Sequence, residues 1–170
     1  LRLEVADRLQ IPREGYNLLW ITEIPFFEWN EELGEWVAMH HPFTAPLDEC
    51  IPYLDSDPAR VYAKAFDLVL NGIELSSGSV RITDPELQSH IFRALHLTDE
   101  EANRKFGHLI EAFRYGAPPH GGMGIGLDRL AMQLTGAASL RDVLAFPKVQ
   151  NMTELMTSCP SPADPAQLGE

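Results

Sequence analysis

The dipeptide Asn71-Gly72 constrains the fold of this chain more than any other short stretch. It lies between "FDLVL" and "IELSSGSVRI", two runs that are typical of β-strands. Asn-Gly favours a two-residue turn whose backbone twist matches that of the strands on either side. The sequence therefore predicts an antiparallel hairpin in which Leu70 faces Ile73.

Two acidic residues of this hairpin are expected on one side of the sheet. Glu74 would face Val69 and Asp67 would face Ser76, and side chains alternate along each strand. Asp67 and Glu74 then lie diagonally across the hairpin, about 7–8 Å apart. Such a pair suits Mg²⁺, which binds carboxylate oxygens and keeps water and substrate phosphates as its other ligands. The alternative is a solvated sheet face with incidental charges, which the spacing does not exclude.

Arg81 follows on the same strand. Simple alternation from Glu74 places it on the opposite side of the sheet. A one-residue bulge near Ser77-Gly78 would turn it to the carboxylate side, and glycine permits such a bulge. The planar guanidinium would then be able to bind a small carboxylate through two hydrogen bonds.

The rest of the chain mixes strands and helices. "LLWITEI" and "EWVAMHH" flank the polar segment "NEELG", which predicts a second antiparallel hairpin. In residues 55–65, Ser56 or Asp57 offers a helix N-cap and Pro58 a first helical residue. Because strands and helices do not alternate strictly, the prediction is an α+β fold with an antiparallel sheet flanked by helices.

Helix caps mark two further helices. Asp84-Pro85 is expected to start the first of them. Thr98 is followed three residues later by Glu101, a spacing that predicts a capping box for the second. This second helix is expected to end at Gly116, before two prolines.

Residues 120–136 read "HGGMGIGLDRLAMQLTG". A strand over 121–126 and a helix over 127–135, ended by Gly136, are expected, and Ser139 would cap a last short helix. The glycines would let a flat ligand lie against the backbone. Arg129, on the first turn of the helix, is placed to reach a phosphate or stack on a purine, or to pair with a surface carboxylate instead.

The adjacent His40 and His41 of "MHHPFT" cannot both face a core, because consecutive strand residues point in opposite directions. The other four histidines are scattered along the chain, so a zinc site lacks partners. One of the two rings is a candidate substrate contact, and the alternative role for such a ring is a structural hydrogen bond.

Composition excludes several classes of protein. With 170 residues, 45% of them hydrophobic and 22% charged, the chain favours one globular domain. No apolar run reaches the roughly 18–20 residues of a membrane span, so no membrane partner is expected. The formal charge of −12 argues against this segment being the main clamp on a nucleic-acid backbone. Cys50 and Cys159 lack metal-ligand spacing and are expected as reduced thiols, and the alternative is one disulfide between them.

Several segments, in this order, resemble the C-terminal part of the catalytic domain of bacterial-type aspartyl-tRNA synthetases. They are "AMHHPFTAP", "FDLVLNGIEL", "GSVRI", "KFGHLIEAFRYGAPPHGG", "GLDRL" and "RDVLAFPK". "GLDR" alone resembles the third motif of class II aminoacyl-tRNA synthetases. "MHHPFT" together with "GAPPHGG" and "AFPK" narrows the resemblance to the aspartate enzymes and disfavours the related lysine and asparagine enzymes.

The resemblance implies an aspartate–tRNA ligase of the cytoplasm, which activates L-aspartate with ATP and Mg²⁺ and then transfers it to tRNA. It implies the following site residues: Glu74, Gly126, Leu127, Asp128 and Arg129 for ATP; His40, His41 and Arg81 for aspartate; Asp67 and Glu74 for Mg²⁺. Glu74, Arg81 and Arg129 would serve catalysis by positioning and charge neutralisation. The two carboxylates, Arg81 and Arg129 are expected to converge on one concave surface.

The resemblance also divides the chain. Residues 1–14 would be the tail of an upstream or inserted domain, and residues 15–170 the C-terminal part of the class II catalytic domain. No counterpart of the family's anticodon-binding domain or of its first two class motifs is found, so the fragment alone is expected to be inactive. The complete enzyme would be a homodimer. The alternative is a non-catalytic, synthetase-like module that binds a nucleotide or a partner.

Three positions depart from the family pattern. Ser76-Ser77 stands where the family usually has two glycines, Thr83 where it has histidine, and Gly124 where it has alanine. The two serines add side chains beside the expected bulge, at a place where a ligand would approach the backbone.

Overall fold

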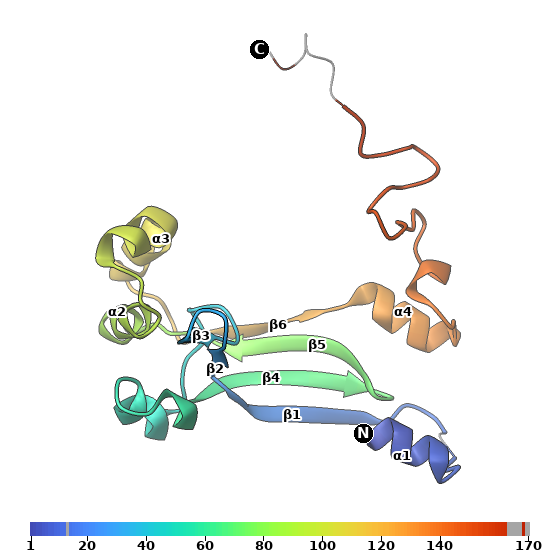
Figure 1. Cartoon of the computed structure of the whole chain (residues 1–170), viewed down its shortest axis with the longest axis horizontal. Helices are drawn as coiled ribbons and strands as arrows, with labels where there is room; N and C mark the ends of the chain where they lie inside the picture. The colour runs from blue at the N-terminus through green and yellow to red at the C-terminus, as the bar shows by residue number, and fades with distance from the viewer. Residues whose placement is uncertain (13, 163–167, 169–170) are drawn as a thin grey trace. The chain divides into compact units, whose positions relative to one another are not determined.

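The computed structural model describes residues 1–12, 14–162 and 168, and its helices and strands are drawn in Figure 1. In chain order they are α1 (Arg2–Arg8), β1 (Leu18–Pro25), β2 (Phe27–Asn30), β3 (Glu35–Ala38), η1 (Asp48–Tyr53), η2 (Pro58–Arg60), β4 (Tyr62–Leu70), β5 (Ile73–Val80), α2 (Pro85–Ala94), α3 (Asp99–Arg114), β6 (Gly121–Ile125), α4 (Leu127–Thr135) and η3 (Leu140–Asp142). The chain forms two compact units, residues 1–125 and residues 126–170.

A four-stranded antiparallel sheet forms the centre of the first unit, with the strand order β1-β4-β5-β6. β4 and β5 are joined at Asn71-Gly72, and Leu70 pairs with Ile73 as predicted. Asn71 (φ 52°) and Gly72 (φ 85°) both adopt the left-handed conformation that this tight turn requires. The predicted α+β fold with an antiparallel sheet is confirmed.

The register beyond this turn differs from the prediction. Val69 faces Glu74 as expected, but Asp67 pairs with Ser77, so the prediction that Asp67 faces Ser76 is wrong. The cause is one additional residue, Leu75, in β5. Leu75 is only 7% exposed, so the bulge adds an apolar side chain that the fold buries.

Gly78 allows neighbouring atoms to pack closely against β5, and it is not the site of the predicted bulge. A Cβ atom on Gly78 would lie 2.5 Å from the carbonyl oxygen of Gly122, 2.6 Å from Cε2 of Phe66 and 2.7 Å from Cβ of Met123. The bulge prediction at this position is therefore wrong, because the glycine is needed to let β6 and Phe66 approach β5. At Gly122, by contrast, no atom lies within 4 Å of the place that a Cβ would take.

The second predicted hairpin forms from different strands. Its turn follows Asn30, but it joins β2 to β3, and β1, which contains "LLWITEI", pairs with β4. The predicted pairing of "LLWITEI" with "EWVAMHH" is therefore wrong. Phe26, 3% exposed, lies between β1 and β2 and anchors this change of direction in the core.

The helix expected in residues 55–65 is a single 3-10 turn, η2, with Asp57 at its N-cap and Pro58 in its first position. The chain then becomes β4, because Val61, Ala63 and Ala65 are all buried, with a period of two residues. Only a strand places such residues on one face. Alternating burial thus overrides the helix-start signal.

Helices α2 and α3 begin at their predicted caps. Asp84 accepts hydrogen bonds from backbone N–H groups of α2, and Thr98 forms the capping box with Glu101 at the start of α3. Both helices lie at the end of the sheet where β4 begins (Figure 1). The core of the unit is at this end and includes Ile91 of α2.

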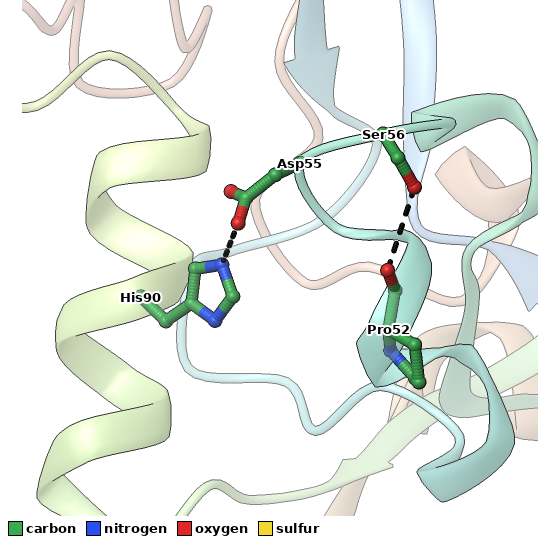
Figure 2. A network of polar contacts seen from close by, with 4 residues as sticks. All are labelled: Pro52, Asp55, Ser56 and His90. Carbon is green, nitrogen blue, oxygen red and sulfur yellow. Dashed lines mark hydrogen bonds and ion pairs between the residues drawn. The ribbon is translucent and has the colours of Figure 1, made fainter.

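A side-chain contact connects α2 to the segment that follows η1. Figure 2 shows Nε2 of His90 hydrogen-bonded to Oδ2 of Asp55 at 2.8 Å. The segment that carries Asp55 is itself closed by a hydrogen bond from Oγ of Ser56 to the carbonyl oxygen of Pro52, at 3.4 Å. α2 is thereby tied to the chain that leads into β4.

The second unit contains α4 and η3. Gly136 ends α4 in the left-handed conformation (φ 67°), and Ser139 forms a capping box with Asp142 at the start of η3. These predictions are confirmed. Arg129 lies on the first turn of α4 and is half-buried.

Two expectations from composition concern the whole chain. Cys50 is buried and Cys159 is exposed, and the two do not form a disulfide with each other; that both are reduced thiols stays a prediction. Among the described residues, no helix combines the length and apolar character needed to cross a membrane.

Replacing Gly78 by alanine is expected to lower the free energy of unfolding by about 1–3 kcal/mol, because β5 and β6 must separate to admit the methyl group. The matched control is Gly122→Ala on the paired strand, where the methyl group meets open space. Equilibrium urea denaturation of both variants measures the difference. Equal stabilities would contradict the close approach at Gly78.

Candidate functional site

A cavity of about 380 Å³ opens on the sheet of the first unit. Its walls come from β4, β5 and the residue that follows it, β6 and the loop after β3: His40, His41, Thr44, Ala65, Ser77, Gly78, Ser79, Arg81, Gly122, Met123 and Gly124. None of these lining residues is acidic, and Arg81 is cationic. The cavity therefore suits a small anionic ligand.

The bulge at Leu75 determines the side on which Arg81 lies. Because Ser77 pairs with Asp67 and Ser79 with Ala65, the side chains of Ser77 and Ser79 share a face with these partners. Arg81 continues this alternation and lines the cavity. The expectation that a bulge turns Arg81 to the carboxylate side is met, although the bulge lies at a different residue.

Backbone hydrogen bonds place the loop after β3, which carries His40 and His41 and is called the histidine loop below, beside Arg81. The N–H of Ala45 donates to the carbonyl oxygen of Val80, and the N–H of Ile82 donates to that of Phe43, both at 2.9 Å. Between them, Thr44 and Arg81 form an isolated antiparallel bridge. The structure thus brings together three residues predicted from the sequence, namely His40, His41 and Arg81.

Two residues that sequence reasoning missed hold this loop. The ring of Phe43 meets that of Phe106 in α3 edge-on, with ring centroids 5.0 Å apart. Gln88 of α2, 7% exposed, donates from Nε2 to the carbonyl oxygen of Pro42 at 2.9 Å. A single polar residue on the buried side of a helix gives no signal in hydrophobic periodicity, and the contacts of Phe43 depend on distant helices.

His41 is in direct contact with Arg81. Nη1 of Arg81 lies 3.0 Å from Nδ1 of His41 and also contacts Nε2 of the ring. The backbone N–H of Phe43 donates to Nδ1 at 3.2 Å. Burial, and then the charges of Arg81 and His40, lower the pKa of His41 below its ordinary value of 6.5. The ring is therefore neutral at pH 7 and able to accept a hydrogen bond from Arg81.

Two polar atoms in the cavity wall have no protein partner. Nε2 of His40 and Oγ of Ser79 are buried, and neither forms a hydrogen bond with any of the described residues. Buried polar groups in folded proteins usually have a partner. These two atoms mark places where a polar ligand atom would be accepted.

Asp67 and Glu74 share the face of the sheet on which Arg81 lies, but they do not line the cavity. Asp67 is half-buried and Glu74 is exposed. Within the described part of the chain, no group of three or more His, Cys, Asp or Glu side chains is placed to hold a metal ion. Two carboxylates still fit Mg²⁺, which commonly takes one or two from the protein. Their use by Mg²⁺ stays a prediction.

The predicted ATP-binding segment belongs to the second unit. Gly126 is the N-cap residue of α4, and Leu127, Asp128 and Arg129 form its first turn. The two units are described separately, so contact of this segment with ATP stays a prediction. The same holds for the expected convergence of Arg129 with Arg81.

Comparison with known proteins decides the family. The family model described as "tRNA synthetases class II (D, K and N)" matches residues 2–150. The chain belongs to this family. The class II resemblance predicted from the motifs is confirmed.

Relatives within class II agree with this assignment. Aspartate–tRNA ligase of Ruminiclostridium cellulolyticum is 56% identical over 171 residues, which cover all of this chain and 29% of that protein. Aspartate–tRNA(Asp/Asn) ligase of Dictyoglomus turgidum is 55% identical over the same shares. The chain thus spans under a third of the length of these relatives. Aspartyl tRNA synthetase from Entamoeba histolytica has a similar fold, with a TM-score of 0.55 and 29% identity over 68% of this chain and 21% of that one.

The lowered pKa of His41 predicts a pH dependence of stability. Between the folded-state pKa and 6.5, the unfolded chain binds the proton that the folded chain excludes, so stability is full above 6.5 and falls as the pH decreases through this window. NMR titration should give a pKa below 6.5 for His41. In Arg81→Gln it should rise only partly, because burial, the larger cause, remains. A value at or above 6.5 in the unmodified chain would contradict the described contact.

Proposed function

We propose that this chain is the C-terminal part of the catalytic domain of an aspartate–tRNA ligase. The observation that carries the proposal is the cavity in which Arg81 and the neutral His41 meet, within a chain closely similar to aspartate–tRNA ligases. The enzyme would form aspartyl-adenylate from L-aspartate and ATP and transfer the aspartyl group to tRNA. As a complete homodimer it would work in the cytoplasm.

The side-chain carboxylate of L-aspartate would be bound by Arg81. His41 supports this role, because its neutral ring accepts a hydrogen bond from the guanidinium and leaves the positive charge available to the ligand. Asparagine would place an amide donor against the guanidinium donors, a contact that costs binding energy. His40, with its unpartnered Nε2, would contact the remaining polar groups of the amino acid.

ATP would be bound on the other part of the site. Gly126, Leu127, Asp128 and Arg129 would contact the nucleotide, with the Arg129 guanidinium near the adenine and γ-phosphate. Asp67 and Glu74 would hold Mg²⁺, which neutralises phosphate charge when bound. The α-carboxylate of aspartate would then attack the α-phosphate and release pyrophosphate. Positioning and charge neutralisation suffice for this step, without a protein nucleophile.

Exposed apolar side chains on β1 support a larger catalytic domain. Leu18, Trp20 and Ile21 are 63%, 53% and 44% exposed, and they lie on both faces of this edge strand. A sheet face that meets water usually carries polar side chains, and an exposed apolar patch marks an interface. The family resemblance supports the further proposal that residues 15–170 belong to this domain and residues 1–14 to the end of an upstream or inserted one.

ATP–pyrophosphate exchange tests the proposed function. Residues 1–170 alone should give negligible aspartate-dependent exchange. A hybrid enzyme, in which these residues replace the corresponding segment of the Ruminiclostridium enzyme, should exchange at a rate comparable to that of the parent. A folded hybrid that binds ATP without exchange would contradict the proposal and favour a non-catalytic nucleotide-binding module.

Arg81→Gln in this hybrid enzyme should lower kcat/KM for L-aspartate by about 100-fold or more, because a charged hydrogen-bond partner of the ligand is removed. The matched control is Arg104→Gln, at an exposed position of α3, which should leave kcat/KM unchanged. If both substitutions had the same small effect, Arg81 would not bind the substrate.

A further inference from the structure

Ser79 is a buried polar residue of the cavity to which the resemblance assigns no role. It is 3% exposed, and it contributes to the cavity wall two residues before Arg81. None of the described residues forms a hydrogen bond with its Oγ. The hydroxyl group thus keeps its full capacity to donate and accept one.

The neighbours of Ser79 across the sheet leave room for a ligand. It pairs with Ala65 of β4 on one side and with Gly122 of β6 on the other. A Cβ on Gly122 would meet no atom within 4 Å. The hydroxyl group therefore lies in a slot between alanine and glycine, the two smallest residues, with open space over Gly122.

Arg81 defines what enters this slot. It is the only Arg or Lys among the described residues that line the cavity. Ser79 and Arg81 are successive residues on one face of the strand, about 7 Å apart along the backbone, and the arginine side chain is long enough to span this distance. A carboxylate offers about four acceptor sites, of which an arginine fork uses two, so a hydroxyl group at the base of the slot can fill a third.

We propose that Ser79 is a further amino-acid-binding residue, whose hydroxyl group donates a hydrogen bond to the carboxylate bound by Arg81. The identity of that carboxylate, the side chain of L-aspartate, rests on the proposed function. Binding would satisfy a hydroxyl group that is buried without a partner in the free protein. Alanine at this position would remove the hydrogen bond and leave the fold intact.

Ser76 provides a matched control on the same strand. It is also 3% exposed, and its Oγ also has no partner among the described residues. It pairs with Leu68 and Ile125, lies on the opposite face of the sheet and does not line the cavity. Ser76→Ala therefore removes a hydroxyl group of the same kind without touching the proposed contact.

The test compares Ser79→Ala, Ser79→Thr and Ser76→Ala in the hybrid enzyme by ATP–pyrophosphate exchange. Ser79→Ala should raise KM for L-aspartate about tenfold or more, the loss expected for a hydrogen bond to a charged group, and leave KM for ATP unchanged. Ser79→Thr, which keeps the hydroxyl group, should recover part of this loss. Ser76→Ala should change neither constant.

Calorimetric titration with L-aspartate alone repeats the comparison without turnover, so it separates this inference from the proposed function. Weaker aspartate binding in Ser79→Ala than in Ser76→Ala supports the inference even if the hybrid shows no exchange, a result that would sink the proposed function alone. Equal aspartate binding in the two variants overturns the inference. A Ser79→Ala substitution that changes only KM for ATP also overturns the inference, whatever the exchange rate of the parent hybrid.

Discussion

In β5, one additional residue at Leu75 shifts every later side chain of the strand to the other face of the sheet. Without it, Ser76 and Gly78 would face the cavity and Arg81 would point away. With it, Ser77, Ser79 and Arg81 take that face. The buried Leu75 side chain favours this register, because it adds apolar contact where the bulge leaves the ladder. The packing of one core side chain thus determines where the charge of Arg81 lies, and the proposed ligand binding depends on that position.

Helix packing then fixes what surrounds this charge. Phe43, held against the aromatic rings of α2 and α3, and Gln88, bonded to the backbone of Pro42, keep the histidine loop beside the end of β5. Next to Arg81, desolvation of the His41 ring and the charge of the guanidinium lower the pKa of His41, which favours the neutral ring. A charged imidazole would repel the guanidinium, whereas the neutral ring accepts a hydrogen bond from it. The packing of the loop against α2 and α3 thus both stabilises the loop and leaves the positive charge of Arg81 available.

Local signals in the sequence were sufficient wherever neighbouring residues decide the structure. The turn at Asn71-Gly72, the capping box of Thr98 and the helix over 127–135 follow from backbone conformation and caps, and all three are confirmed. The partner of β1 and the position of the bulge were wrong. Both depend on which side chains the whole sheet buries, and hydrophobic patterns within one segment do not contain that information.

The same division applies to the candidate site. His40, His41 and Arg81 were predicted, and the structure brings them together. Ser79 was missed, because its unpartnered hydroxyl group becomes apparent only when Ala65 and Gly122 are known to be its neighbours. The roles of Asp67, Glu74 and Arg129 stay predictions, since they concern bound ATP and Mg²⁺.

A crystal structure of the hybrid enzyme with L-aspartate bound tests the central claim most directly. The account predicts that Leu75 is the additional residue of β5, and that the Arg81 guanidinium makes two hydrogen bonds to the aspartate side chain within the cavity beside His41. A regular pairing of β5 with β4 through Leu75, with Arg81 on the opposite face and aspartate bound elsewhere, would contradict it.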